Sequence, residues 1–218
     1  MRITKIEKQK GHPERRNIYA DGSFLLGASA ETLIRHRLRI GDEIEPAALR
    51  SLLQTEELLN AKRTALRYLS YRPRTEREVR HKLREQDFPD HEISTTIDDL
   101  KRARLLDDEA FARMYVRDAL ALRPSGKLLL KRKMLLLGVA RPLVDHVLDE
   151  AFAGVDQIDV ALDAAKKFLK KAGDKKTDAA KIRSRVGGFL ARRGYTWDVI
   201  EPVLNTLFKN AQHEKHIE

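Results

Sequence analysis

Side chains that could catalyse a reaction or hold a metal ion are few in this sequence. His213 and His216 stand at a helical spacing that can bring two imidazoles to one metal, but they lie in a polar tail. Gly126-Lys127 lacks the upstream glycine and the following Ser or Thr of a phosphate-binding loop. Cysteine is absent, which excludes disulfides and thiolate metal sites. We therefore expect no catalytic residue, no metal site and no cofactor, and we predict that the protein is not an enzyme.

Acidic pairs and isolated histidines have a structural interpretation. Asp98-Asp99 and Asp107-Asp108-Glu109 could bind a cation through their carboxylates. The second group, however, opens a predicted helix, where negative charge is favoured by the helix dipole. His81 and His91 flank a predicted turn, and we interpret both as exposed polar residues.

Basic side chains offer a different chemistry, the binding of a long polyanion. The 43 Lys and Arg residues outnumber the 33 Asp and Glu residues, for a formal net charge of +10. Such a surplus is the electrostatic signature of nucleic-acid binding, although it could also serve only to solvate a helical surface. The cations that we predict to lie at a binding surface are Arg72, Arg74, Arg77, Arg80, Lys82, Arg84, Arg123, Lys127, Lys131, Arg132, Lys133, Arg192 and Arg193. The last cluster also contains Lys175, Lys176, Lys181, Arg183 and Arg185.

Four aromatic residues near these clusters could stack on bases. They are Tyr68, Tyr71, Tyr195 and Trp197. Tyr68 and Tyr195 fall on the apolar pattern of the chain, which favours the hydrophobic core for these two.

The elements that must position the basic clusters are predicted helices. Thr75 and Glu78 have the spacing of a capping box, which predicts that a helix starts at Thr75. Apolar residues follow at helical intervals, and Phe88-Pro89-Asp90 then ends the helix, with Asp90 as the expected cap of the next one.

This pattern recurs twice, because shifts of 51 and 107 residues take the apolar positions onto other apolar residues. The three aligned sets are Val79, Leu83, Phe88, Ile93 and Ile97; Leu130, Met134, Val139, Val144 and Leu148; and Val186, Leu190, Tyr195, Ile200 and Leu204. A period of this length is typical of helical repeat proteins, whose neighbouring repeats bury a shared core. The sequence predicts a mainly α protein with three tandem three-helix repeats in an elongated curved array.

The first residues read differently, as a small β-rich module. Asp21-Gly22 between two apolar runs predicts a β-hairpin. Ser29 is a predicted helix cap, and Pro46 is predicted to start a long helical region. We predict this module over residues 1–55, the three repeats over 56–106, 107–156 and 157–218, a linker at Gly173–Lys176, a helix cap at Thr177 or Asp178, and a frayed polar tail over 209–218.

Two features of the third repeat are unusual for helices. Gly187-Gly188 falls inside a predicted helix, where each glycine costs about 1 kcal/mol relative to Ala. Pro202 lies beyond the first turn of the last helix and should bend it. Close helix packing at the glycines and a hinge are both open interpretations.

No apolar run approaches the length of about 18 residues that a membrane span requires. Leu128–Leu130 and Leu135–Leu137, for example, are separated by Lys131-Arg132-Lys133. No signal-like segment opens the chain, and we expect a cytoplasmic protein without a membrane partner.

Longer motifs resemble a known family, the RecX regulatory proteins. The motifs in the repeats are YLSYRPRTEREVRHKL, LLDDEAFARMYV and LRPSGKLLLKRKMLLLGV. The segments ITKIEKQK, IYADGSFLLG and LRIGDEI are similar to the β-hairpin extension that many members carry. The resemblance covers essentially the whole chain and is strongest in residues 65–140.

This resemblance implies a bacterial regulator of the RecA recombinase, with roles in DNA repair, homologous recombination and the SOS response. It implies a monomer that binds the groove of the RecA filament on single-stranded DNA and suppresses ATP hydrolysis and strand exchange, with duplex DNA as a further partner. It brings no family-wide catalytic residue. The basic positions that match its motifs are Arg72, Arg74, Arg77, Arg123 and Lys127.

Two other functions are compatible with the same residues. The segment from Leu190 to Ile200 looks like a helix-turn-helix, so the protein could bind duplex DNA without any recombinase. The repeats could also form a plain scaffold for another protein, with charge serving only solubility.

Overall fold

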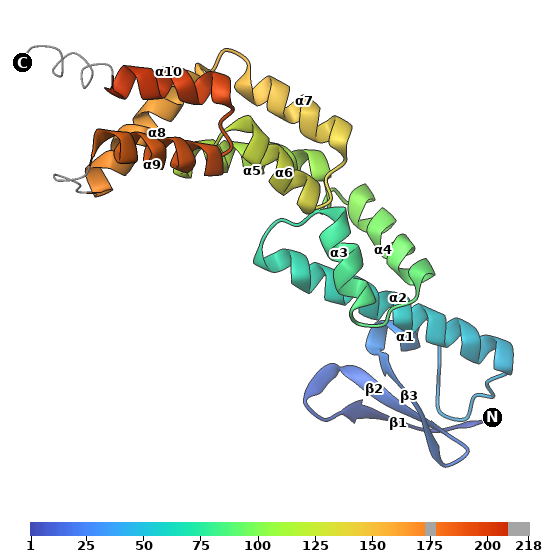
Figure 1. The fold of residues 1–218 in the computed structure, drawn as a ribbon. Helices are drawn as coiled ribbons and strands as arrows, with labels where there is room; N and C mark the ends of the chain where they lie inside the picture. Colours follow the sequence, from blue (N-terminus) through green and yellow to red (C-terminus); the bar gives the residue numbers. More distant parts are fainter. Residues whose placement is uncertain (173–177, 209–218) are drawn as a thin grey trace, which may run out of the picture. The chain divides into compact units, whose positions relative to one another are not determined.

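The computed structural model of the chain describes residues 1–172 and 178–208 (Figure 1). It forms two compact units. The first comprises Met1–Pro73 and Val79–Leu105, and the second comprises Arg74–Glu78 and Leu106–Glu218. The predicted linker at Gly173–Lys176, the cap at Thr177, the cations Lys175 and Lys176, and the tail with His213 and His216 lie outside the described residues.

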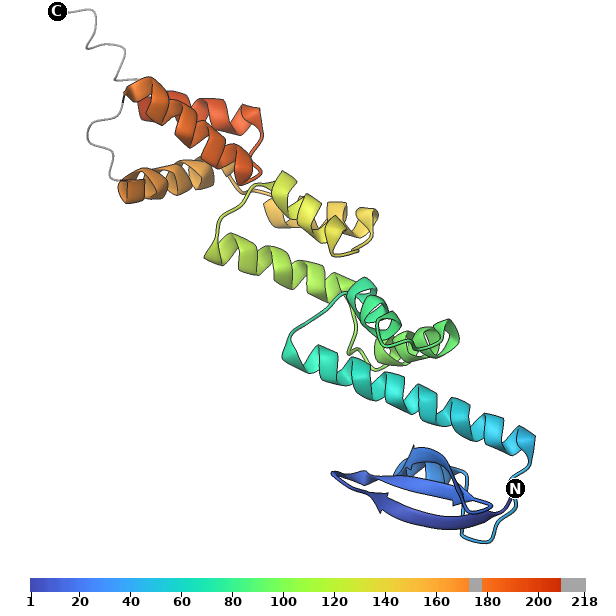
Figure 2. The same ribbon diagram turned by 60° about the horizontal axis from the view of Figure 1, so that its bottom comes forward.

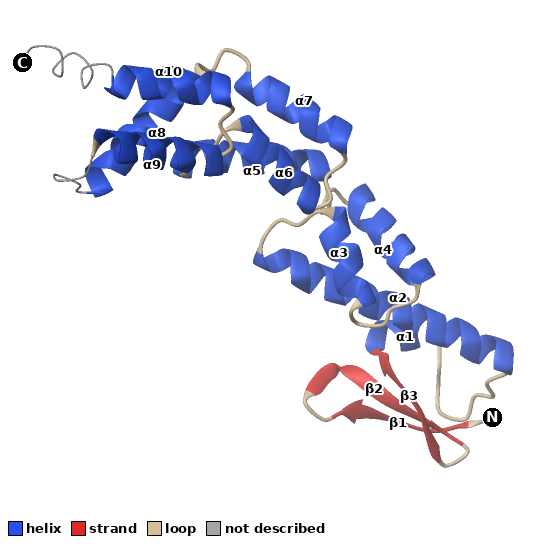
Figure 3. Ribbon diagram, viewed as in Figure 1, coloured by secondary structure: helices blue, strands red, loops and turns tan. Residues whose placement is uncertain are grey.

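The first unit begins with the predicted β module. Strands β1 (Ile3–Gln9), β2 (His12–Ala20) and β3 (Ser23–Ser29) form an antiparallel sheet in the order β1-β2-β3 (Figure 3). Asp21 and Gly22, with φ angles of 49° and 81°, make the tight turn between β2 and β3, which confirms the hairpin prediction.

One face of this sheet packs on two helices, α1 (Ala30–Arg35) and α2 (Pro46–Tyr71). Ser29 caps α1 through Thr32, as predicted, and Pro46 opens α2. The buried carboxylate of Glu56 on α2 accepts hydrogen bonds from Ser29 N at 2.8 Å and Thr32 Oγ1 at 2.6 Å. This carboxylate ties the end of the sheet to the long helix. The core residues of the module are Ile3, Ile18, Leu26, Ala28, Ile44 and Leu52.

The first repeat continues with α3 (Glu76–Arg84) and α4 (Asp90–Arg102). The capping box is confirmed, since Glu78 N donates to Thr75 Oγ1 at 3.2 Å and Thr75 N donates to Glu78 Oε2 at 3.1 Å. The predicted cap at Asp90 is wrong, because Pro89 occupies the cap position and Asp90 is the first helical residue. The carboxylate of Asp90 instead accepts from Arg84 at 3.2 Å.

The second unit contains the other two repeats (Figure 2). The second repeat consists of α5 (Asp108–Leu122), α6 (Lys127–Leu136) and α7 (Arg141–Phe152), and the third of α8 (Gln157–Ala172), α9 (Ala179–Arg192) and α10 (Trp197–Phe208). Asp107 caps α5 and Asp178 caps α9. Every residue of the three aligned apolar sets is buried except Phe88, which is half-buried. The repeat predicted from the sequence is therefore confirmed.

Gly187→Ala is expected to raise the free energy of unfolding of the third repeat by about 1 kcal/mol. A Cβ at this position would lie 3.5 Å from Leu204 Cδ1, an ordinary contact, so the packing does not require glycine. Urea denaturation of the variant and the wild type measures the difference. A loss of stability would show that α9 uses the conformational freedom of this residue.

Candidate nucleic-acid interface

A groove of about 630 Å³ opens within the second unit, between the second and third repeats. Four of the predicted site residues line it: Arg123, Lys133, Arg192 and Arg193. They come from the end of α5, from α6, and from the end of α9 and the residue after it. The fold thus gathers cations that are up to 70 residues apart in sequence. We call this site, together with its lining residues Tyr115, Asp118, Leu122 and Leu129, the basic groove.

A backbone contact between two glycines holds the walls of the basic groove together. Gly126 N donates to the carbonyl of Arg193 at 2.8 Å. A Cβ at Gly126 would lie 2.2 Å from the carbonyl oxygen of Gly194, and one at Gly194 would lie 2.3 Å from Leu129 Cβ. Gly194 also has a φ angle of 81°, in the region that favours glycine. The start of α6 can approach the end of α9 this closely only because both side chains are absent.

The same contact occurs one repeat earlier, again among residues of the second unit. Thr75, which aligns with Gly126 in the shift of 51 residues, donates its hydroxyl to the carbonyl of Leu137 at 2.6 Å. Leu137 precedes Gly138 as Arg193 precedes Gly194, and Gly138 has a φ angle of 92°. A Cβ at Gly138 would lie 2.2 Å from Arg77 Cδ, so the stem of Arg77 packs on this glycine. Thr75 and Gly126, at equivalent positions, therefore make equivalent contacts within the second unit.

The positive charge of the basic groove is largely uncompensated. Among the residues that the structure describes, Arg123, Lys133 and Arg192 form no salt bridge with a carboxylate. The one carboxylate that lines the groove, Asp118, lies 3.2 Å from Arg117 Nε. Arg193 has a structural role as well, since it donates to the carbonyl of Pro124 at 3.2 Å and stacks over the ring of Phe189. Three cations are thus available to an anionic ligand.

Several other predicted site residues are neutralised by acids within the fold. Lys127 pairs with Asp149 and Lys131 with Asp145, and the hydrogen bond from Lys127 holds the pKa of Asp149 below its ordinary value. The remaining pairs are Arg74 with Glu78, Lys82 with Glu85, and Arg84 with Asp90, while Arg80 donates to Ser94 Oγ. These contacts reduce the charge that such residues can offer to a ligand.

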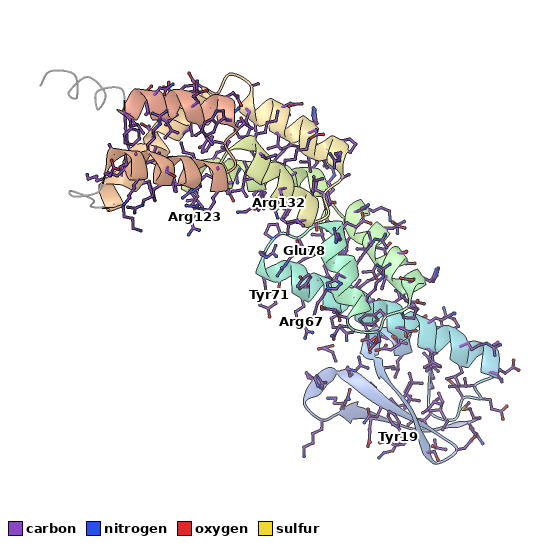
Figure 4. The ribbon with its side chains drawn as sticks, in the orientation of Figure 1. Tyr19, Arg67, Tyr71, Glu78, Arg123 and Arg132 are labelled. Carbon is purple, nitrogen blue, oxygen red and sulfur yellow. The ribbon has the colours of Figure 1, made fainter. Side chains whose placement is uncertain are left out.

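Three further predicted cations, Arg72, Arg77 and Arg132, are exposed, whereas Arg183 is half-buried and donates to the carbonyl of Leu204 at 3.2 Å. Arg72 belongs to the first unit and donates to the carbonyl of Pro73. Arg77 is exposed beyond its packed stem, and Arg132 is exposed on α6, where Figure 4 marks it together with Arg123. The predicted basic cluster of residues 72–84 is divided between the two units. Arg74 and Arg77 belong to the second unit, and the other cations of this cluster belong to the first.

The aromatic candidates separate clearly by burial. Tyr195 is only 4% exposed and lies in the core of the third repeat, which confirms the structural interpretation of this residue. Tyr71 and Trp197 are exposed by 78% and 64%. Tyr115 lines the basic groove, and burial raises the pKa of its hydroxyl.

Sequence reasoning missed some residues that could contact a ligand. Tyr115 is one of them: its ring stacks on Phe111 in the same helix, as a residue of the apolar core would, and it also lines the basic groove. Arg63 and Arg67 on α2 were not included, because the basic clusters were sought around the second helix of each repeat. The four-residue steps from Arg63 to Arg67 and from Arg67 to Tyr71 are the signal that could have identified them.

Two further features of the described part of the chain concern metal ions and membranes. No group of three or more His, Asp and Glu side chains there is arranged to hold a metal ion. No helix among residues 1–172 and 178–208 is both long and apolar enough to cross a bilayer.

Comparisons with known proteins cover each part of the chain. Residues 1–45 match the family model described as Regulatory protein RecX N-terminal domain, and residues 61–100, 107–148 and 156–204 match the first, second and third three-helix domains of RecX. The chain is 31% identical to the regulatory protein RecX of Clostridium beijerinckii, across 93% of this chain and 94% of that protein. It is 34% identical to that of Bacillus velezensis, across 93% of this chain and 76% of the relative.

Solved structures agree. A crystal structure of a regulatory protein RecX superposes with a TM-score of 0.69 at 27% identity, covering 93% of this chain and 98% of the other. That of RecX from Lactobacillus salivarius, at 24% identity and a TM-score of 0.58, covers 70% of this chain and 97% of the other, and supports the fold. The chain therefore belongs to the RecX family of regulatory proteins.

Proposed function

We propose that the protein binds the filament that RecA forms on single-stranded DNA, in the groove of that filament, and lowers its ATP hydrolysis and strand exchange. Family membership supports a regulatory role. The observation that carries the proposal is the basic groove. Arg123, Lys133 and Arg192 line it, and none of the three has a carboxylate partner among the described residues. Neutralising phosphates with such cations releases counterions and drives binding to nucleic acids.

The lining of the basic groove suits a single strand. Tyr115, Leu122 and Leu129 supply apolar surface beside the cations, and Leu122 is 80% exposed. Unpaired bases can stack on or pack against such side chains, whereas paired bases cannot. The basic groove therefore offers both phosphate and base contacts.

Duplex reading by a helix-turn-helix has less support. In that mode the last helix of a repeat would enter the major groove and approach the DNA backbone. The exposed positions of α10 include Asp198 and Glu201. Phosphate would repel these two carboxylates.

Tandem repeats give a physical route to inhibition. The chain carries three tandem three-helix repeats, and a filament presents identical subunits at regular intervals. Several weak contacts made by one chain act together, because each contact raises the effective concentration of the next. A chain that holds neighbouring recombinase subunits would oppose the movements of their ATPase cycle.

The test is a titration of this protein into the cognate recombinase while single-strand-dependent ATP hydrolysis is measured. We expect inhibition at substoichiometric amounts, because one bound chain affects more than one subunit. Tight binding to duplex DNA with no effect on ATP hydrolysis at saturation would contradict the proposal and favour a helix-turn-helix protein. Binding to neither filament nor DNA would favour a scaffold for another partner.

A further inference from the structure

A second surface with nucleic-acid chemistry lies on α2, in the first unit. Arg63, Arg67 and Tyr71 recur every four residues, so they share one face of the helix. All three are exposed, and Figure 4 shows Arg67 and Tyr71 projecting from α2. We call these three residues the α2 stripe.

The α2 stripe lies in a stretch of the sequence that has basic but no acidic residues. Residues 58–75 contain Lys62, Arg63, Arg67, Arg72 and Arg74 but no Asp or Glu. Lys62 pairs with Asp99, whereas Arg63 donates to the neutral amide of Asn60 at 3.2 Å. Arg67 forms no salt bridge among the described residues. Helix-dipole stabilisation does not account for Arg63, which lies two turns before the end of α2 and so beyond the last turn, where that effect acts.

Tyr71 adds a stacking group at one end of this charge. Its side chain is 78% exposed, so it contributes little to the core. An aromatic ring beside arginines is the combination that single-stranded nucleic acids engage, with the ring under a base and the guanidinium groups on the phosphates. Successive residues of the stripe rise about 6 Å along the helix, a distance similar to that between neighbouring phosphates of one strand.

We propose that the α2 stripe is a second binding site for single-stranded nucleic acid, separate from the basic groove. Arg63 and Arg67 bind consecutive phosphates, and Tyr71 stacks on an adjacent unpaired base. The choice of ligand rests on the proposed function, in which the strand is that of the recombinase filament. One chain then carries a strand-binding site in each unit, and simultaneous engagement strengthens both.

A protein partner fits the α2 stripe less well. The centre of a protein interface is usually depleted in charge and built around packed apolar and aromatic side chains. The stripe has one aromatic ring with arginines along the same face, and no carboxylate within residues 58–75 offsets their charge. This composition is complementary to a polyanion.

The experiment measures the binding of the full chain to a fluorescent oligothymidylate by anisotropy across a series of salt concentrations, without any recombinase. Arg63→Gln/Arg67→Gln is expected to reduce the slope of log affinity against log salt by about 1.4. Tyr71→Ala should weaken binding by about 5-fold to 100-fold, and Tyr71→Phe, which keeps the ring, should bind as the wild type does.

The matched control is Arg50→Gln/Arg104→Gln, which removes two exposed cations elsewhere on the first unit and should leave the slope within about 0.3 of the wild type. Equal slopes for the stripe and control variants would overturn the proposal. So would stripe variants that bind the oligonucleotide normally but lose binding to recombinase free of DNA, because the ligand would then be protein. Since this assay contains no recombinase, it can succeed even if the inhibition of ATP hydrolysis fails.

Discussion

An Arg123→Gln/Lys133→Gln/Arg192→Gln variant is expected to bind single-stranded DNA roughly 100-fold more weakly than the wild type at moderate salt. Each substitution removes one charge that has no carboxylate partner among the described residues and that lines the basic groove. The salt slope should fall by about 2, since each phosphate contact on a single strand contributes about 0.7. Inhibition of the recombinase should fall in parallel, and anisotropy and ATP hydrolysis together measure the effect.

The control for this variant keeps the change in net charge and moves it elsewhere in the second unit. Lys127→Gln/Lys131→Gln/Arg141→Gln also removes three cations, but two of them are already paired with Asp149 and Asp145. The long-range attraction between protein and DNA changes equally in both variants, while the contacts between DNA and the basic groove change only in the groove variant. If the control lost as much affinity as the groove variant, binding would depend on total charge and the groove would not be a site.

Local signals in the sequence predicted most of the fold. The capping box at Thr75 and Glu78, the turn at Asp21-Gly22, the helix start at Asp107–Glu109 and the cap at Asp178 each involve residues within a few positions of one another. The period of the apolar residues predicted the buried residues of all three repeats, because each repeat must bury the same face of its helices. Asp90 was assigned wrongly by one position, since Pro89 can itself serve as the cap residue.

The site was predicted less well because charge compensation depends on distant partners. Lys127 and Arg123 look equivalent in the sequence, yet the fold gives Lys127 a carboxylate 22 positions away. The basic groove itself depends on the contact between Gly126 and Gly194, which no local sequence pattern predicts. Gly126 directly precedes α6 and Gly194 follows α9, and neither position in the sequence reveals that the two residues touch.

Gly194→Ala is expected to lower the free energy of unfolding of the second unit by about 3 kcal/mol. The new methyl group would meet Leu129 at 2.3 Å, where backbone as well as side chain must move, and alanine is strained at a φ angle of 81°. Gly126→Ala should have a comparable effect through the carbonyl of Gly194, 2.2 Å from its Cβ. The single tryptophan, Trp197 on α10, provides a fluorescence signal from the third repeat during urea unfolding.

Gly187→Ala is the control for both glycine variants, because it adds the same methyl group within the second unit, at a position where the nearest atom of another helix, Leu204 Cδ1, is 3.5 Å away. A lower free energy of unfolding for Gly194→Ala and a higher one for Gly187→Ala would separate a steric effect between repeats from a general effect of helix propensity. Variants at Gly126 and Gly194 that remain folded at low temperature should also bind single-stranded DNA more weakly, since displacement of α6 from the end of α9 moves Lys133 away from Arg192. If Gly126→Ala and Gly194→Ala both had wild-type stability and wild-type affinity for single-stranded DNA, the second and third repeats would not meet through this contact. The basic groove would then not be held in the arrangement described.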